Sequence, residues 1–444
     1  MKRSRDIAGE NSVGREAAVP ILELPGKMAY SDAFGKHLVN TLQTYGCALV
    51  RCSPELTLDL ARCDTLARRF FAGDLRGAQD VSDKAQWTVP CPVGSFCGFH
   101  QPSPAKEVFR YRFGLEHALH RSDLQVHNEA DVGPCRSCQN PDSCNFAECS
   151  STNCFLRAMK RAARGLRELA MQLSIVLLTS TANTTWGADD AKVLLDDLIE
   201  DISFSSCGQA KSEGHAQTPA LTLPIPPFDA FHYFNDAGSE PVPNCAPHVD
   251  PGIITLIPLA EVPGLAVRPP RQNNNELSEE IEAAAGSCDL SGEYDIDEWL
   301  GIEEHAHTSL RCSEDCHSIR KSRGDPSNRN GSFPCQQRLI TVLAGEVLES
   351  LTACVIPAGE HKVIRPPPAI KDTRSSIPSL SSPKTKTTDT TQPRFSLVFD
   401  LQIPAANAAL VQAEATRLME RSSRREAQPP LYSIQGVAGR RASS

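Results

Sequence analysis

The sequence has no long apolar run. No stretch approaches the roughly 20 consecutive apolar residues that a membrane-spanning helix requires. The first residues mix Lys2, Arg3, Arg5 and Arg15 with acidic side chains, and they contain no apolar segment of the kind found in secretory signals. We therefore expect a cytoplasmic protein without a membrane partner, and the nucleus stays open as an alternative compartment.

The chain also lacks an excess of positive charge. Its 45 Lys and Arg residues are outnumbered by 54 Asp and Glu residues, which gives a formal net charge of −9. Proteins that bind nucleic acid through its phosphates usually carry a basic face. We therefore expect no nucleic-acid partner.

Cysteine is plentiful, but a disulfide framework is not expected. Without a secretory signal, the 17 cysteines are predicted to be thiols or metal ligands, because disulfides persist in oxidising compartments. Five of them lie in one polar segment: Cys135, Cys138, Cys144, Cys149 and Cys154. Cys135 and Cys138 have the spacing of zinc ligands. The segment suggests a structural zinc, with an ordinary cysteine-rich loop as the alternative.

Changes in composition along the 444 residues indicate how the chain is divided. No Lys or Arg lies between Arg271 and Arg311, acidic residues gather from Glu276 to Glu304, and residues 366–393 are rich in Pro, Ser and Thr. We predict a disordered tail at 1–18, an N-terminal region of helices and strands at 19–228 with a cysteine-rich loop at 135–154, a β-rich core at 229–404 with insertions at 271–337 and 366–393, and a C-terminal helix and tail at 405–444.

The spacing of apolar residues predicts the elements outside the core. Residues 155–180 repeat apolar side chains at helical spacing, and shorter helices are expected at 31–45, 55–71 and 405–424. The Gly and Pro at 98–102 favour a loop, which a strand at 106–112 should follow. Arg110 and Arg112 would share one face of that strand, either solvated or turned toward a substrate.

His248 and Asp250 precede a run of β-branched and aliphatic residues. Residues i and i+2 of a strand point to the same face, so both side chains can reach one point. One imidazole and one carboxylate are two-thirds of a 2-His-1-carboxylate iron site. His361 follows another strand signal at 339–343 and is the candidate third ligand. A histidine in a surface loop after Gly359 is the alternative for this position.

Four further features lie in the order of a known family: Tyr233, the strand after Asp250, the distant His361, and Arg394-x-Ser396. With these motifs the sequence resembles the 2-oxoglutarate- and iron(II)-dependent dioxygenases of the isopenicillin-N-synthase-like group. The resemblance implies a mainly β fold with flanking helices, in which a double-stranded β-helix (jelly-roll) core follows an N-terminal α/β region.

The resemblance also implies the chemistry of the site. His248, Asp250 and His361 would bind Fe(II), and Arg394 would hold the distal carboxylate of 2-oxoglutarate together with Ser396 and Tyr233. No catalytic residue beyond these ligands is implied. The enzyme would use O2 to decarboxylate 2-oxoglutarate and oxidise an organic, small-molecule substrate, with ascorbate as a supporting reductant. The identity of the substrate and the oligomeric state stay open.

The sequence departs from the family pattern between His361 and Arg394, which the family places closer together. A looped-out segment at 366–393 explains the longer separation, because long surface loops add little closure entropy. Arg374 also has Arg-x-Ser spacing, but it has no strand context and is rejected. Arg394 as an ordinary salt-bridge partner and Tyr233 as a packing residue stay open. So does a non-catalytic scaffold that binds partners through the cysteine-rich loop or the acidic insertion.

Overall fold

The computed structural model describes residues 19–24, 32–90, 96–113, 151–181, 186–199, 226–235, 244–270, 299–312, 339–365, 392–404 and 407–426. The predicted tail at 1–18, nearly all of the cysteine-rich loop and most of both predicted insertions lie outside these residues. Of the five clustered cysteines only Cys154 is described, and its side chain is buried. The zinc prediction therefore stays a prediction.

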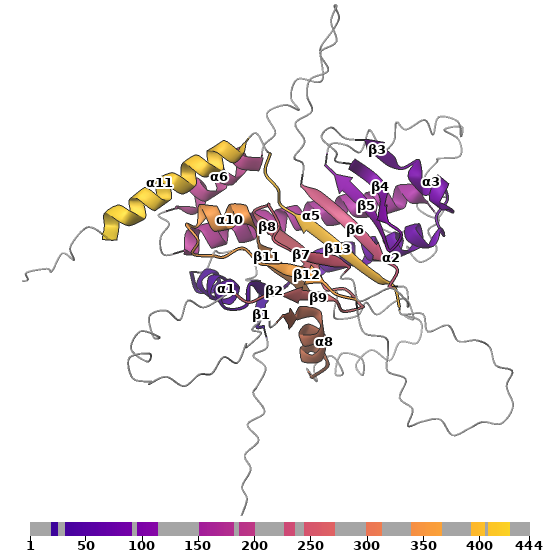
Figure 1. Cartoon of the computed structure of the whole chain (residues 1–444), viewed down its shortest axis with the longest axis horizontal. Helices are drawn as coiled ribbons and strands as arrows, with labels where there is room; N and C mark the ends of the chain where they lie inside the picture. Colours follow the sequence, from indigo (N-terminus) through magenta and orange to yellow (C-terminus); the bar gives the residue numbers. More distant parts are fainter. Residues whose placement is uncertain are drawn as a thin grey trace, which may run out of the picture.

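The strands form two sheets (Figure 1). The nine-stranded sheet has the order β1 (Ile21–Glu23), β2 (Cys47–Arg51), β11 (Leu339–Ala344), β8 (Ile254–Pro258), β13 (Arg394–Asp400), β6 (Pro227–Tyr233), β5 (Lys106–Arg112), β4 (Phe96–Ser103) and β3 (Thr88–Pro90). The four-stranded sheet has the order β10 (Leu300–Gly301), β9 (Leu265–Val267), β12 (His361–Val363) and β7 (Cys245–His248).

From β6 onward the chain winds between the two sheets. Strands β6, β8, β11 and β13 belong to the large sheet, whereas β7, β9, β10 and β12 belong to the small one. Among these eight strands most neighbours within a sheet are therefore not consecutive in the chain; β8, for example, lies between β11 and β13. This winding defines a jelly roll. It confirms the double-stranded β-helix fold that the motifs imply.

Alternation along the strands sorts their side chains between the two faces of the large sheet. On β13, Leu397 and Phe399 belong to the main hydrophobic core, whereas Arg394 and Ser396 occupy the alternate positions. A second, smaller core lies between the sheets and includes Leu49 of β2 and Val267 of β9. The alternate face of β13 is thus the face turned toward the small sheet.

Helices cover the other face of the large sheet (Figure 1). Helix α5 (Thr152–Ser180) contacts α1 (Asp32–Tyr45), α2 (Pro54–Ala72), α6 (Ala188–Ile199) and β8. Its apolar stripe is buried from Met159 to Leu177, as its periodicity predicts. The other helices among the described residues are α3 (Val81–Ala85), α8 (Ile302–Cys312), α10 (Glu346–Leu351) and α11 (Ala408–Glu426). None of the helices in the described ranges is long and apolar enough to cross a membrane.

Two segments differ from the sequence-based expectation. The predicted loop at 98–102 is wrong, because these residues belong to β4 and pair with β5. Gly98 takes a positive φ of 94°, and the strand lies near the sheet edge, where exposed polar residues are tolerated. Within the expected insertion at 271–337, β10 pairs with β9 and α8 packs beside it. This part of the acidic segment belongs to the core.

Asp400 ends β13 as a buried carboxyl group. Its Oδ2 accepts a 2.5 Å hydrogen bond from Gln402, and its Oδ1 has no hydrogen-bond partner among the described residues. A Cβ atom on Gly252 would lie 2.0 Å from Oδ1, so only glycine fits there. Burial, and to a smaller extent the negative charge of Asp250, raises the pKa of Asp400 to about 8. The folded protein therefore keeps this carboxyl protonated at neutral pH.

Replacing Asp400 by Asn is expected to change how stability depends on pH. In the unfolded chain the carboxyl ionises near pH 4, so between about pH 4 and 8 the wild type loses roughly 1.4 kcal/mol of unfolding free energy per pH unit from this group. Asparagine does not titrate, so the free energy of unfolding of the variant, relative to that of the wild type, should increase as pH rises. Urea unfolding at pH 5, 6, 7 and 8 measures this difference. A difference that is constant with pH would contradict the protonated state of Asp400.

Candidate iron centre

Three side chains from two distant parts of the sequence meet at the small sheet. His248 ends β7 and His361 begins β12, and the two residues are direct partners in the antiparallel register. Asp250 follows His248 by two positions. One ligand atom from each of the three residues lies within 4.8 Å of the other two. The structure thus brings together the three residues that the sequence predicts as metal ligands.

Backbone carbonyls fix both imidazole rings. Nδ1 of His248 lies 2.9 Å from the carbonyl oxygen of Ala246, and Nδ1 of His361 lies 3.1 Å from that of Gly359. A carbonyl can only accept, so each Nδ1 carries the proton and donates it. The two Nε2 atoms are left for other partners, which is how protein scaffolds orient metal-binding histidines.

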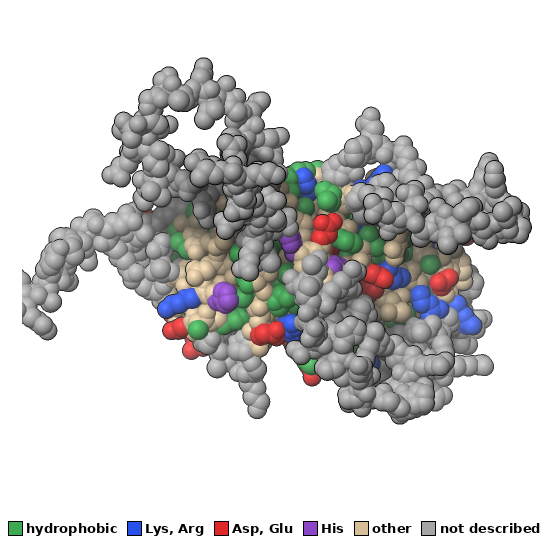
Figure 2. Space-filling model, turned by 90° about the horizontal axis from the view of Figure 1, so that it is seen from below, with side chains coloured by type: hydrophobic (Ala, Val, Ile, Leu, Met, Phe, Trp, Pro, Cys, Tyr) green, Lys and Arg blue, Asp and Glu red, His purple; other side chains and the backbone are tan. Residues whose placement is uncertain are grey.

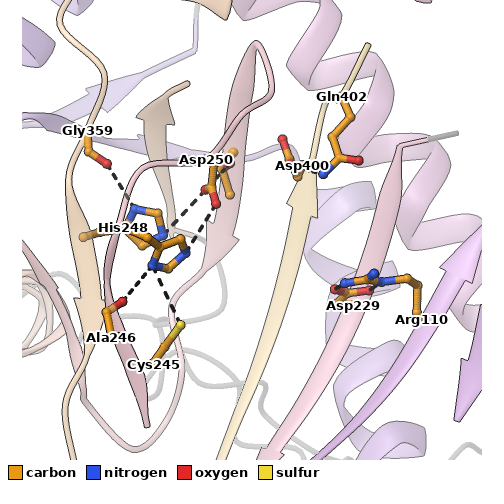
Figure 3. A network of polar contacts seen from close by, with 11 residues as sticks. Arg110, Asp229, Cys245, Ala246, His248, Asp250, Gly359, Asp400 and Gln402 are labelled. Atoms are coloured by element: carbon orange, nitrogen blue, oxygen red, sulfur yellow. Dashed lines mark hydrogen bonds and ion pairs between the residues drawn. The ribbon is translucent and has the colours of Figure 1, made fainter. Parts of the chain in front are cut away.

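Both Nε2 atoms face the carboxylate of Asp250. The Nε2 atom of His248 is 3.5 Å from Oδ1, and that of His361 is 3.6 Å from Oδ2. Figure 3 shows His248 turned toward Asp250, with Cys245 and Ala246 on the opposite side of its ring. Thr255 of β8 donates a 2.5 Å hydrogen bond to Oδ2. The carboxylate is therefore oriented by a buried hydroxyl from the facing sheet.

The charges of the three groups are coupled. The hydrogen bond to Asp250, and then the one to Cys245, raises the pKa of His248 to about 10. Burial lowers the pKa of His361, against the attraction of Asp250. Burial raises the pKa of Asp250, but contacts with His248, His361 and Thr255 outweigh it and the net direction is down. Without metal, His248 is an imidazolium that pairs with Asp250, while His361 is neutral.

The three groups fit a ferrous ion. Two imidazoles and one carboxylate are the donor set of non-haem Fe(II) oxygenases, and they leave positions open on the other side of the ion. The site is accessible, because the His248 side chain is 40% exposed while that of His361 is 5% exposed. On the face seen in Figure 2, histidine and acidic side chains reach the surface close together near the centre of the view.

Replacing Thr255 by Val should weaken iron binding roughly tenfold, because the change removes the hydrogen bond that orients Asp250 but keeps the side-chain shape. Thr255 is buried, so its loss should not open the site to solvent. Anaerobic calorimetric titration with Fe(II) measures the effect. Thr341→Val is the matched control, since Thr341 is buried in the neighbouring strand β11. Equal affinities in the two variants would show that Thr255 has no role at the metal.

The predicted co-substrate residues lie together on the alternate face of β13 and β6. Arg394 and Tyr233 are direct partners in the register, and the Tyr233 ring centroid is 5.9 Å from the Arg394 guanidinium carbon. Ser396 is buried two residues further along β13. The Arg394 side chain reaches the small sheet, since a Cβ atom on Gly264, just before β9, would lie 2.9 Å from its Nε.

Arg394 is also a salt-bridge partner, the alternative role that the sequence leaves open for this residue. Its Nη2 donates to both carboxylate oxygens of Glu303, at 2.8 and 2.9 Å, and both side chains are completely buried. No sequence pattern indicates this pair, because Glu303 lies in an acidic segment that predicts an exposed insertion. The contact between Thr255 and Asp250 could have been predicted from the sequence, because Thr255 is a polar residue at an inward position of the strand after Asp250.

The two arginines of β5 do not share a solvated face. Arg110 makes two hydrogen bonds to Asp229 of β6, at 2.8 and 2.6 Å, and Nε of Arg112 donates to the carbonyl of Phe96. Arg112 is buried. In Figure 3 the Arg110–Asp229 pair lies beyond Asp400 as seen from His248. The prediction of a solvated face is therefore wrong for Arg112.

No family model matches the chain, and no curated protein does either. Solved structures do. A Neurospora crassa protein in complex with alpha-KG and 5-formyluracil is 14% identical, with a TM-score of 0.46 and coverage of 88% of this chain and 86% of that one. The dioxygenase for auxin oxidation in rice is 14% identical, with a TM-score of 0.45 and coverage of 88% and 84%. Dioxygenase for auxin oxidation 1 from Arabidopsis thaliana, in its 2-oxoglutarate complex, is 12% identical, with a TM-score of 0.43 and coverage of 87% and 94%.

Two of these neighbours are named as dioxygenases, and two are complexes with alpha-KG or 2-oxoglutarate. Their identities and TM-scores are low. What the chain does has to be inferred from its own side chains.

Proposed function

We propose that this chain is an Fe(II)- and 2-oxoglutarate-dependent oxygenase that oxidises a small organic molecule. The observation that carries the proposal is the convergence of His248, Asp250 and His361, whose ligand atoms lie within 4.8 Å of one another. Their fixed rings and oriented carboxylate supply the donors that a ferrous ion requires. When bound, the iron supplies the oxidising chemistry, coupling decarboxylation of 2-oxoglutarate by O2 to hydroxylation or a related oxidation of the substrate.

Each ligand has a different task in this proposal. His361 offers a neutral Nε2 from a buried position, so it needs no proton loss before it binds metal. His248 must release its Nε2 proton, and its exposed side chain gives that proton a path to solvent. Asp250 balances part of the charge of the ion, and Thr255 keeps its second oxygen oriented.

Arg394 would bind the distal carboxylate of 2-oxoglutarate. Two of its nitrogen atoms support this role, because Nε and Nη1 are buried and have no hydrogen-bond partner among the described residues. A buried guanidinium donor without a partner is costly, and a carboxylate would satisfy it. Ser396 and Tyr233 lie on the same face and would donate their hydroxyl protons to the same group.

The substrate is proposed to be a small organic molecule. The same face of β6 carries Phe231 and Tyr233, and Lys106 of β5 lies over both rings, with its Nζ 4.4 and 5.4 Å from their centroids. Together with the Arg110–Asp229 pair, these groups mix aromatic and polar surface, as is usual for sites that bind small molecules.

Release of labelled CO2 tests the proposed activity. Purified chain with Fe(II), ascorbate and carboxyl-labelled 2-oxoglutarate should release CO2, slowly without substrate and faster when a metabolite mixture contains the substrate. Asp250→Ala should remove the activity. A folded, iron-loaded wild type that releases no CO2 would contradict the proposal and favour a non-catalytic scaffold.

A further inference from the structure

Glu303 already forms a salt bridge with Arg394, the side chain proposed to bind the distal carboxylate of the co-substrate. It comes from the first turn of α8, and its two oxygens lie 2.8 and 2.9 Å from Nη2 of Arg394. Neither side chain has any exposed surface. A carboxylate on this arginine is what the proposed function requires of 2-oxoglutarate, but here the protein itself provides it.

The backbone holds Glu303 in place. The amide of Ala260 donates to Oε1 at 3.1 Å, and the amide of Leu265 donates to Oε2 at 2.9 Å. Ala260 lies in the connection from β8 to β9 and Leu265 begins β9, so the carboxylate joins α8, β9 and β13. Four hydrogen bonds to charged or backbone donors make this a fixed part of the core, unlike a surface ion pair.

The contact with Glu303 limits how many hydrogen bonds a second carboxylate can accept from Arg394. An arginine binds a carboxylate best through two parallel N–H groups on one edge of the guanidinium, and both such edges of Arg394 include Nη2. Because Glu303 takes Nη2 with both of its oxygens, a ligand is left with Nη1 or Nε alone. A ligand carboxylate would also stand close to the negative charge of Glu303 in a buried, poorly screened place.

We propose that Glu303 sets the affinity of this enzyme for 2-oxoglutarate by sharing Arg394 with it. This inference rests on the proposed function. Glu303 neutralises the guanidinium before the co-substrate arrives, so the distal carboxylate of 2-oxoglutarate gains little more than one hydrogen bond. The chain therefore needs a higher 2-oxoglutarate concentration than an oxygenase whose arginine is unpaired, and Glu303 is the specificity-determining residue for the anionic end of the co-substrate.

Calorimetric titration of 2-oxoglutarate into anaerobic, Fe(II)-loaded protein tests the inference. Glu303→Gln keeps the side-chain size and removes the negative charge, so it should bind 2-oxoglutarate at least about tenfold more tightly than the wild type. Glu304→Gln is the matched control, because it removes the same charge from an exposed neighbour in the same helix turn. It should bind 2-oxoglutarate as the wild type does.

Equal or weaker binding in Glu303→Gln would overturn the inference and make Glu303 a residue that only positions Arg394. The proposed function would survive that result as long as the wild type binds 2-oxoglutarate. If none of the three iron-loaded chains bound 2-oxoglutarate, the proposed co-substrate and the inference would both be overturned.

A second measurement needs no variant, in case Glu303→Gln does not fold. The compound 2-oxopentanoate has a methyl group where 2-oxoglutarate has its distal carboxylate. With Arg394 neutralised, the wild type should bind 2-oxoglutarate less than about tenfold more tightly than 2-oxopentanoate. A larger preference for 2-oxoglutarate would show that Arg394 acts as a free cation, and would overturn the inference.

Discussion

Iron binding is expected to fall by at least about 100-fold when His361 is replaced by Ala. Loss of an outer-shell partner alone typically costs 10- to 100-fold in metal affinity, so loss of a direct ligand should cost at least as much. His361 is also the ligand that offers a neutral nitrogen without losing a proton. Anaerobic titration with Fe(II), followed by metal analysis of the desalted protein, measures the loss.

The control for this prediction is His37→Ala, which removes an exposed imidazole on α1. It should bind iron as the wild type does. If His361→Ala retained wild-type iron affinity with an intact fold, iron would have to bind elsewhere in the chain.

Replacing Arg394 by Leu should weaken 2-oxoglutarate binding and also destabilise the fold. The change removes the proposed co-substrate cation, and it leaves the buried carboxylate of Glu303 without its charged partner. Removing one partner of a buried ion pair costs roughly 3–5 kcal/mol, because an uncompensated charge stays in the core. Urea unfolding and calorimetry with 2-oxoglutarate measure the two effects separately.

A double variant distinguishes the two roles of Arg394. Arg394→Leu with Glu303→Leu removes both charges, so it should recover most of the lost stability, whereas 2-oxoglutarate binding should stay weaker than in the wild type. Arg374→Ala, at the rejected Arg-x-Ser position, should change neither property. A double variant as unstable as Arg394→Leu would show that the buried pair is not the source of the instability.

The three proposed metal ligands could be predicted from short-range spacing and strand signals. Asp250 does not share a strand with His248 as expected, because β7 ends at His248, but the two-residue separation still brings both side chains to one point. A strand signal preceded the segment that carries His361. The structure adds what the sequence could not state, namely that His361 lies opposite His248 in the register and that both rings are fixed by carbonyls. Pairing between distant strands depends on tertiary packing, which one sequence does not reveal.

Glu303 could not be predicted, for a physical reason. Acidic residues without neighbouring basic ones usually lie in solvent, and Glu303 is separated from Arg394 by 91 positions. The Glu303 carboxylate can be buried because Arg394 and two backbone amides all donate hydrogen bonds to it. The strand at Phe96–Ser103 was missed for a different reason, since Gly98 and Pro102 suggest a loop but are tolerated near a sheet edge.

The most direct test of the iron centre is X-ray absorption spectroscopy on the anaerobic, Fe(II)-loaded wild type. Two imidazole nitrogens and a carboxylate predict a first shell of nitrogen and oxygen atoms at about 2.0–2.2 Å, with the outer-shell scattering of two histidine rings. Among the described residues Cys245 is a competing ligand, since its Sγ lies 3.8 Å from Nδ1 of His248. A sulfur shell at about 2.3 Å, or scattering from fewer than two imidazoles, would contradict the assignment of His248, Asp250 and His361 as the iron ligands.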